Sequence, residues 1–135
     1  MRRLTDEHLR AAVLALVALE QQAPAVPGEV SLRYDEQVAW LELDNPGAHN
    51  AMTVRMMRQL AEAVLELSSW DGAIVAIRSK NGGSFCSGGH LAQVRQALVQ
   101  PEAGRVMTDC MSQVLDALLN LEVVGVAILE GAAIG

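Results

Sequence analysis

Residues 73–95, AIVAIRSKNGGSFCSGGHLAQVR, pass from the pattern of a strand to a glycine-rich bend and then to the pattern of a helix. This succession is the strongest indication of the fold. The β-branched apolar run at 74–77 has the length of a buried strand, and apolar residues recur at helical spacing from Leu91 onward. Between them lies a glycine-rich polar bend. Such a bend leaves backbone N–H groups unpaired at the helix start, where an anion or a polarised carbonyl oxygen can bind. The alternative is a loop that only needs two flexible residues, Gly88 and Gly89.

The patterns outside this stretch predict further helices and strands in alternation. Residues 5–22 predict an amphipathic helix capped by Thr5 or Asp6, which lies on the surface, on its own domain or on a partner subunit. A proline-containing linker follows. Strands are expected at 30–34, 38–43, 74–77 and 124–129, with a turn at 35–37 between the first two. Helices are expected at 53–67 (capped by Thr53), 91–98 and 106–121, with an interruption at 101–104. The inward face of the last helix is expected to include Leu115 and Leu119.

The composition limits the classes of function and the compartment. The chain has 135 residues and a formal net charge of −6, so it offers no basic patch for nucleic acid. No apolar run has the ~18 residues of a membrane span, which predicts no membrane partner. Two cysteines, Cys86 and Cys110, are expected to be free thiols in a cytoplasmic protein, with a disulfide as the alternative. No metal-ligand spacing occurs, so no metal site is expected.

Four segments, in the same order along the chain, resemble those of one family. Residues 85–91, FCSGGHL, are similar to F-C-[AS]-G-[AG]-D-[LI] of the crotonase superfamily, the enoyl-CoA hydratase/isomerase fold. Residues 41–52, LELDNPGAHNAM, resemble the segment L-x-R-P-x-x-x-N-A-[LM], and the helix at 53–67 resembles the one that follows it. Residues 126–135, VAILEGAAIG, resemble A-A-V-x-G-x-A-x-G-G-G, cut short. The resemblance covers about residues 30–135 and leaves 1–29 unexplained.

The resemblance implies an α/β fold, a truncated crotonase-like ββα spiral with an extra amino-terminal helix. Residues 1–29 would form this helix and its linker, and residues 30–135 the amino-terminal part of a crotonase-like domain. The last strand would then lie at an exposed edge of the sheet. Association into a homotrimer or hexamer, or a completing second chain, would cover that edge.

The resemblance also implies a site for an acyl-CoA substrate, in which CoA is part of the substrate and no cofactor is tightly bound. Crotonase-like enzymes hold the thioester carbonyl between two backbone N–H donors that stabilise developing negative charge. The first donor would be the N–H of Gly89. Gly135 would start the second oxyanion turn, whose donor glycine would follow it. The residues expected along the CoA are Ala48, Ser87, Gly89, His90 and Leu91.

Three departures from the family pattern leave the reaction open. Gly47 stands where a basic residue often contacts a phosphate, and His90 stands where an aspartate is usual. His90 either orders the loop or takes part in catalysis. The family's acid/base carboxylates follow the last glycine turn, and Glu130 matches neither of them. The chain is therefore expected to be a fragment of a longer enzyme, half of a split enzyme or a pseudo-enzyme, and the first two are favoured.

Two functions from different classes follow from the resemblance. The first is an acyl-CoA enzyme that hydrates a 2-enoyl-CoA, the commonest activity, or decarboxylates a short malonyl-CoA derivative. The decarboxylase branch is indicated by the residues at 85–88, FCSG, together with the insert at 101–104, PEAG. This chain alone is expected to be inactive. The alternative is a non-catalytic crotonase-like fragment that binds a complete subunit.

Overall fold

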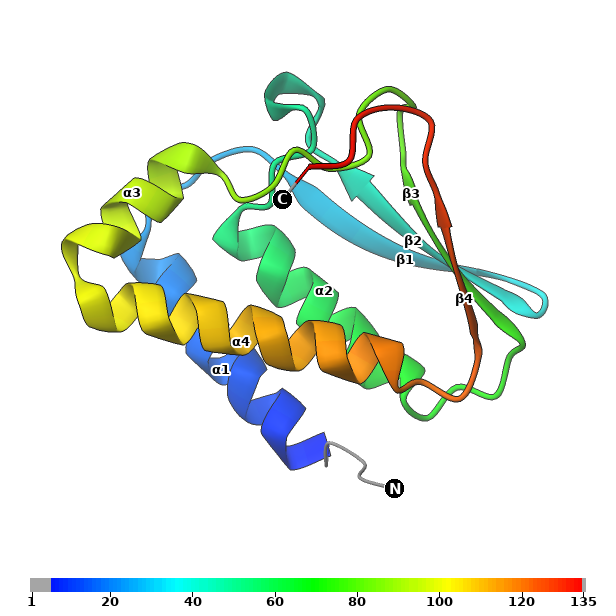
Figure 1. Cartoon of the computed structure of the whole chain (residues 1–135). Helices are drawn as coiled ribbons and strands as arrows, with labels where there is room; N and C mark the ends of the chain where they lie inside the picture. The colour runs from blue at the N-terminus through cyan, green and yellow to red at the C-terminus, as the bar shows by residue number, and fades with distance from the viewer. Residues whose placement is uncertain (1–5, 135) are drawn as a thin grey trace.

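The computed structural model describes residues 6–134, apart from the side chains of 97 and 98, and has a four-stranded sheet with helices beside it (Figure 1). The strands are β1 (Glu29–Asp35), β2 (Val38–Asp44), β3 (Ile74–Ser79) and β4 (Val124–Ile128), in the order β1-β2-β3-β4. β1 and β2 form an antiparallel hairpin, whereas β2, β3 and β4 run parallel. Because parallel neighbours require crossover connections, each later strand is reached through helices. The predicted hairpin is confirmed.

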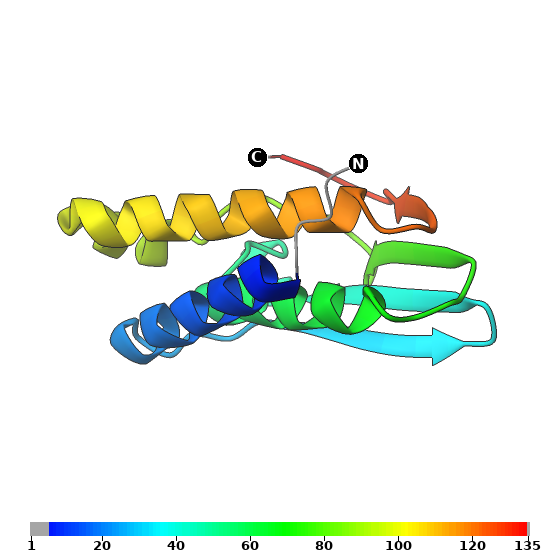
Figure 2. The same ribbon diagram turned by 90° about the horizontal axis from the view of Figure 1, so that it is seen from below.

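The helices are α1 (Asp6–Gln22), α2 (Val54–Leu67), α3 (Leu91–Val99) and α4 (Pro101–Leu119), and a short 3₁₀ turn, η1, covers Pro46–Ala48. α2 begins where predicted, because Thr53 caps it by accepting a hydrogen bond from the Met56 N–H. Figure 2 shows α4 on one side of α1 and α2, with the β1–β2 hairpin extending beside α2. The helices therefore form layers beside the sheet.

α1 packs on its own domain, against α2 and α4. Its inner stripe consists of Leu9, Ala12 and Leu16, all of which are buried. Glu20 near its end binds Arg58 of α2, with 2.8 Å between Oε2 and Nε. Of the alternatives for this helix, the structure thus shows packing within the chain. Of the two predicted caps, Asp6 is the first described residue of α1, and Thr5 lies outside the described residues.

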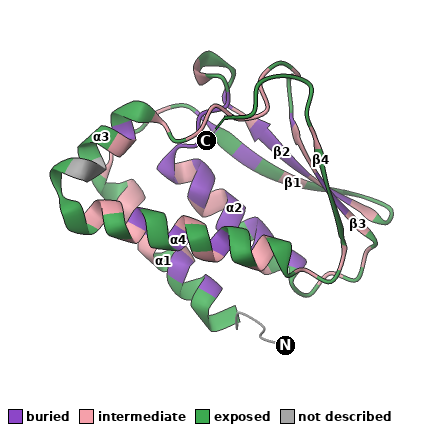
Figure 3. Ribbon diagram, in the orientation of Figure 1, coloured by how far each residue is buried: buried purple, intermediate pink, exposed green. Residues whose placement is uncertain are grey.

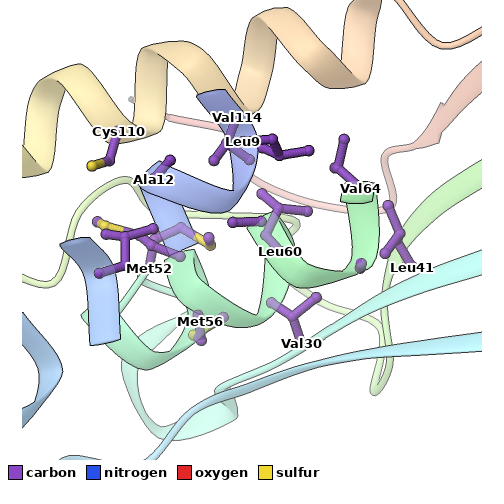
Figure 4. Close-up of a cluster of buried hydrophobic side chains, with 14 of the residues drawn as sticks. Leu9, Ala12, Val30, Leu41, Met52, Met56, Leu60, Val64, Cys110 and Val114 are labelled. Atoms are coloured by element: carbon purple, nitrogen blue, oxygen red, sulfur yellow. The ribbon is translucent and has the colours of Figure 1, made fainter. Parts of the chain in front are cut away.

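The core lies between the helices and the inner face of the sheet (Figures 3 and 4). Four residues that meet there are 0% exposed: Leu41 of β2, Met56 and Val64 of α2, and Val114 of α4. β4 is the exception, because its residues are exposed or only partly buried and it forms an edge of the sheet. The exposed final strand expected from the sequence is confirmed.

Two predictions for α4 were wrong. The predicted interruption at 101–104 is the first turn of the helix, because proline at the first helical position loses no hydrogen bond and has a suitable φ. Leu115 and Leu119 were expected to face inward but are 46% and 83% exposed. The helix instead buries Met107, Cys110 and Val114, and one residue further along a helix turns the side chain by about 100°.

Candidate functional site

Two loops far apart in sequence meet at the carboxyl ends of β2 and β3. The first, residues 45–53, leads from β2 to α2, and the second, residues 80–90, leads from β3 to α3. An isolated parallel bridge joins Met52 to Gly89. The loop that carries the first predicted oxyanion donor is therefore held directly by the loop that was predicted to lie along the CoA.

The bridge determines which way the Gly89 amide points. Met52 N–H donates to the Gly88 carbonyl at 2.7 Å, and His90 N–H donates to the Met52 carbonyl at 2.9 Å. Because successive amides of an extended segment point to opposite sides, the N–H of Gly89 faces away from Met52. Gly89 is exposed, and no group in the described part of the chain accepts a hydrogen bond from its N–H. Such a group can donate to an oxygen of a ligand.

Gly88 gives this loop its shape. Its φ is +101°, a backbone conformation that residues with a Cβ rarely adopt. A side chain at this position would therefore strain the turn that presents the following amide.

The structure brings most of the predicted CoA-side residues together. Ser87 Oγ donates to the Ala48 carbonyl at 3.1 Å, which ties the two loops a second time. Ala48 and His90 line one surface hollow, together with residues 27–29 and 44–47. The Nδ1 atom of His90 is buried and has no hydrogen-bond partner among the described residues. Leu91 begins α3 and is 70% exposed, so its side chain lies outside the buried stripe of the helix.

The charge of this hollow agrees with one departure from the family pattern. The described residues that line it carry two acidic side chains, Glu29 and Asp44, and Gly47 takes the place of the basic residue. Within these residues no lysine or arginine is available for a phosphate. The hollow therefore suits an uncharged part of a ligand better than a phosphate group.

The second glycine turn, at residues 131–134, lies directly against the loop at 80–90. Phe85 N–H donates to the Ala132 carbonyl at 2.8 Å, and Ile134 N–H donates to the Cys86 carbonyl at 2.8 Å. Gly131 makes this approach possible, because a Cβ at this position would lie 2.2 Å from the Gly83 carbonyl oxygen. Gly135, the predicted start of the second oxyanion turn, lies outside the described residues.

Sequence reasoning missed the buried amide side chains that organise the site. Asn50 is 3% exposed, and its side chain binds groups of both loops. Gln93 of α3 is 7% exposed, accepts from the Val54 N–H at 2.8 Å and donates to the Pro24 carbonyl at 3.2 Å. The available signal was the asparagine of the motif at residues 41–52, which is Asn50.

Cys86 and Cys110 are both free, as predicted, and burial raises the pKa of the Cys110 thiol, so this group is a core residue. Within residues 6–134 no group of three His, Cys, Asp or Glu side chains could hold a metal ion. None of the helices described there is both long and apolar enough to cross a membrane.

The fold and the paired glycine loops are those of the crotonase class, and comparisons with known proteins agree. The family model described as enoyl-CoA hydratase/isomerase matches residues 38–135. The chain is 35% identical over 123 residues to ethylmalonyl-CoA decarboxylase of Danio rerio, covering 88% of this chain and 40% of that protein. It is 34% identical over 117 residues to the protein of that name from Homo sapiens, covering 85% and 37%. The solved structure of Pseudomonas aeruginosa AtuE superimposes with a TM-score of 0.71 at 25% identity, covering 76% and 40%.

The chain therefore belongs to the enoyl-CoA hydratase/isomerase family. It has part of the crotonase fold, and the helix α1 precedes the residues that the family model matches. It spans about 40% of the length of the curated relatives that it matches.

Proposed function

We propose that this chain forms the thioester-binding part of an acyl-CoA enzyme and that the Gly89 N–H is one donor of its oxyanion hole. The observation that carries the proposal is the N–H of the exposed residue Gly89, which the bridge turns away from Met52 and leaves without an acceptor in the described part of the chain. An N–H fixed in this way costs no reorganisation when negative charge develops on the thioester oxygen. The second donor would come from the glycine turn that follows Ile134.

The reaction favoured by the relatives' name is decarboxylation of a short malonyl-CoA derivative, and hydration of a 2-enoyl-CoA is the second candidate. In a decarboxylation the bond between the α-carbon and the carboxylate breaks and CO₂ leaves. The bonding electrons move into the α-carbon and the thioester oxygen, forming an enolate that the Gly89 N–H would stabilise. A proton from solvent or an acid then reaches the α-carbon. The support is the printed name of relatives such as that of Danio rerio.

The proposal includes an association that covers β4. Val124, Val126, Leu129 and Ile134 are all exposed, by 42% to 67%, at this edge of the sheet. Unpaired strand edges with apolar side chains favour pairing with another polypeptide. We propose that they contact a completing chain or a neighbouring subunit of a homotrimer or hexamer. Sedimentation of the purified chain would test self-association, and a monomer that remains soluble at high concentration would contradict the homotrimer or hexamer.

Replacing one backbone atom tests the oxyanion donor. Cys86 permits chemical ligation of a synthetic segment 86–135 in which glycolic acid replaces Gly89, so that an ester oxygen takes the place of the N–H. Calorimetry would compare the binding of acetoacetyl-CoA with that of an S-alkyl CoA thioether, which lacks the carbonyl. We expect the unmodified chain to prefer the thioester by about tenfold and the ester to lose this preference, since one hydrogen bond to a polarised oxygen contributes about 1–2 kcal/mol.

The thioether serves as the control for the rest of the ligand. Its affinity should be the same for both chains, because the changed atom would not contact it. If the folded, unmodified chain binds thioester and thioether equally, or binds neither at millimolar concentration, the proposed oxyanion donor is wrong.

A further inference from the structure

Asn50 has an unusual backbone conformation and a fully used side chain. Its φ is +57°, in the left-handed region, and the residue is 3% exposed. Its Oδ1 accepts from the Asn45 N–H at 2.7 Å. Its Nδ2 donates to Ser79 Oγ at 2.8 Å and lies 2.9 Å from the Ser84 carbonyl and 3.2 Å from the Phe85 carbonyl. One amide side chain thus joins the end of β3 to both loops of the site.

The carbonyl groups that Asn50 holds belong to the segment that carries the second glycine turn. Phe85 offers its carbonyl to Asn50, while its N–H donates to Ala132 at 2.8 Å. Cys86, the next residue, accepts from the Ile134 N–H at 2.8 Å. The second turn therefore hydrogen-bonds to the backbone of Phe85 and Cys86, and Asn50 holds the same segment through its carbonyl groups.

The first glycine turn is fixed by the same short segment. Met52, two residues after Asn50, exchanges hydrogen bonds with Gly88 and His90 at 2.7 and 2.9 Å. The segment 50–52 consequently holds one glycine turn through a side chain and the other through its backbone. The distance between the two turns depends on both attachments.

We infer that Asn50 is a positioning residue that sets the separation of the two glycine turns and, through it, the alignment of the proposed oxyanion donors. The inference about the donors rests on the proposed function, whereas the inference about the turns rests on the hydrogen bonds alone. Aspartate at this position keeps the shape but replaces the donating NH₂ by an oxygen that faces the Ser84 and Phe85 carbonyls.

The alternative is that asparagine is present only because it tolerates a positive φ. Asn50→Gly separates the two explanations, since glycine accepts this backbone conformation but lacks the amide. His49 is the matched control: its φ is +53°, but it is exposed and adjacent to Asn50. Asn50→Asp, Asn50→Gly and His49→Gly therefore form one series.

Amide hydrogen exchange on the intact chain tests the positioning of the turns. The probes are the N–H groups of Phe85, Met52 and Ile134, with the buried amides of α2 as an internal reference for global stability. In Asn50→Gly we expect exchange at the three probes to rise at least about tenfold more than at the α2 amides, the factor expected for losing one or two buried hydrogen bonds. Asn50→Asp should show at least as large an effect if it folds, and His49→Gly should show none. Wild-type exchange at the probes of Asn50→Gly would overturn the inference.

The infrared carbonyl frequency of bound acetoacetyl-CoA tests the alignment of the donors. Hydrogen bonds to the thioester oxygen lower this frequency, and loss of stability alone does not change it for the molecules that are bound. We expect Asn50→Gly to return the bound frequency toward that of the free ligand at saturating concentration, whereas His49→Gly keeps it shifted. A wild-type shift in Asn50→Gly would overturn the role in alignment. If the wild-type chain binds no thioester, the proposed function fails, and the exchange result alone decides the role of Asn50 in seating the turns.

Discussion

Gly131 is the point at which a single methyl group should separate the two glycine turns. A Cβ at this position would lie 2.2 Å from the carbonyl oxygen of Gly83 and 2.6 Å from its carbon. The normal distance between a carbon and such an oxygen is about 3.3 Å. Gly131→Ala must therefore move the second turn away from the loop at 80–90 by about 1 Å, because both contacts are backbone atoms that cannot turn aside.

The magnitude follows from the hydrogen bonds that span this gap. Phe85 N–H to Ala132 (2.8 Å), Cys86 N–H to Ala132 (3.3 Å) and Ile134 N–H to Cys86 (2.8 Å) all lie within it. Each contributes about 0.5–1.5 kcal/mol, so loss of all three would lower the free energy of unfolding of Gly131→Ala by about 1.5–4.5 kcal/mol. In a thioester-processing enzyme, a misplacement of about 1 Å would lower the rate by about 10²-fold.

Urea unfolding followed by circular dichroism measures the stability, and hydrogen exchange at the Phe85 amide measures the local opening. Gly125→Ala in β4 is the matched control, because a Cβ there meets nothing within 4 Å. Alanine should leave that strand unchanged or stabilise it by about 0.5–1 kcal/mol. If Gly131→Ala is as stable as Gly125→Ala and the Phe85 amide stays protected, the close contact of the two turns is not as described.

Three further predictions concern α1 and the sheet surface. Leu16→Ala, at a position 0% exposed, should destabilise the chain by about 2.7–5 kcal/mol in urea unfolding, whereas Leu14→Ala, at a position 70% exposed, should stay within about 0.5 kcal/mol. The arginine of α2 that hydrogen-bonds Glu20 holds the pKa of this carboxyl below its ordinary 4.5; Glu20→Gln should therefore cost about 1 kcal/mol at neutral pH. This difference should disappear in acid titration as the pH falls through the lowered pKa, and a constant difference would contradict the ion pair. Burial, and then the Glu66 carboxylate, raise the pKa of Tyr34 to about 12, so ultraviolet titration should give that midpoint and Glu66→Gln a lower one. The stability from this phenol should be lost as the pH rises from 10.0 to about 12, and a midpoint of Tyr34 near 10.0 would contradict its environment.

Local patterns were enough to predict most elements of the fold. The β1–β2 hairpin and the helix after Thr53 were predicted because alternation, turn residues and a capping side chain act over a few residues. The start of α4 was missed because Pro101 is compatible both with a helix break and with a first helical position. The packing of α1 on α2 and α4 was one of several alternatives, since an amphipathic stripe does not say what covers it.

The glycine loop was found from its motif, but the contacts that hold it were not. Asn50 reaches Ser79 and Phe85, 29 and 35 positions further along the chain. Gln93 reaches Val54 and Pro24, 39 and 69 positions back along the chain. Such buried polar contacts have no period in the sequence, so only the folded backbone reveals which amide side chains have carbonyl and N–H partners. The role of Gly89 as a donor stays a prediction.

The two hydrogen bonds of Gln93 have a practical consequence for anyone who trims the chain. Shortening it to its family-matched residues would remove the Pro24 acceptor and, with it, one of the two hydrogen bonds of Gln93, a residue that is only 7% exposed. The Val54 amide at the start of α2 would then depend on a glutamine that is free to turn. The residues before the family-matched part thus stabilise the helices that flank the glycine loops, and they should be retained with these helices in any chimaera.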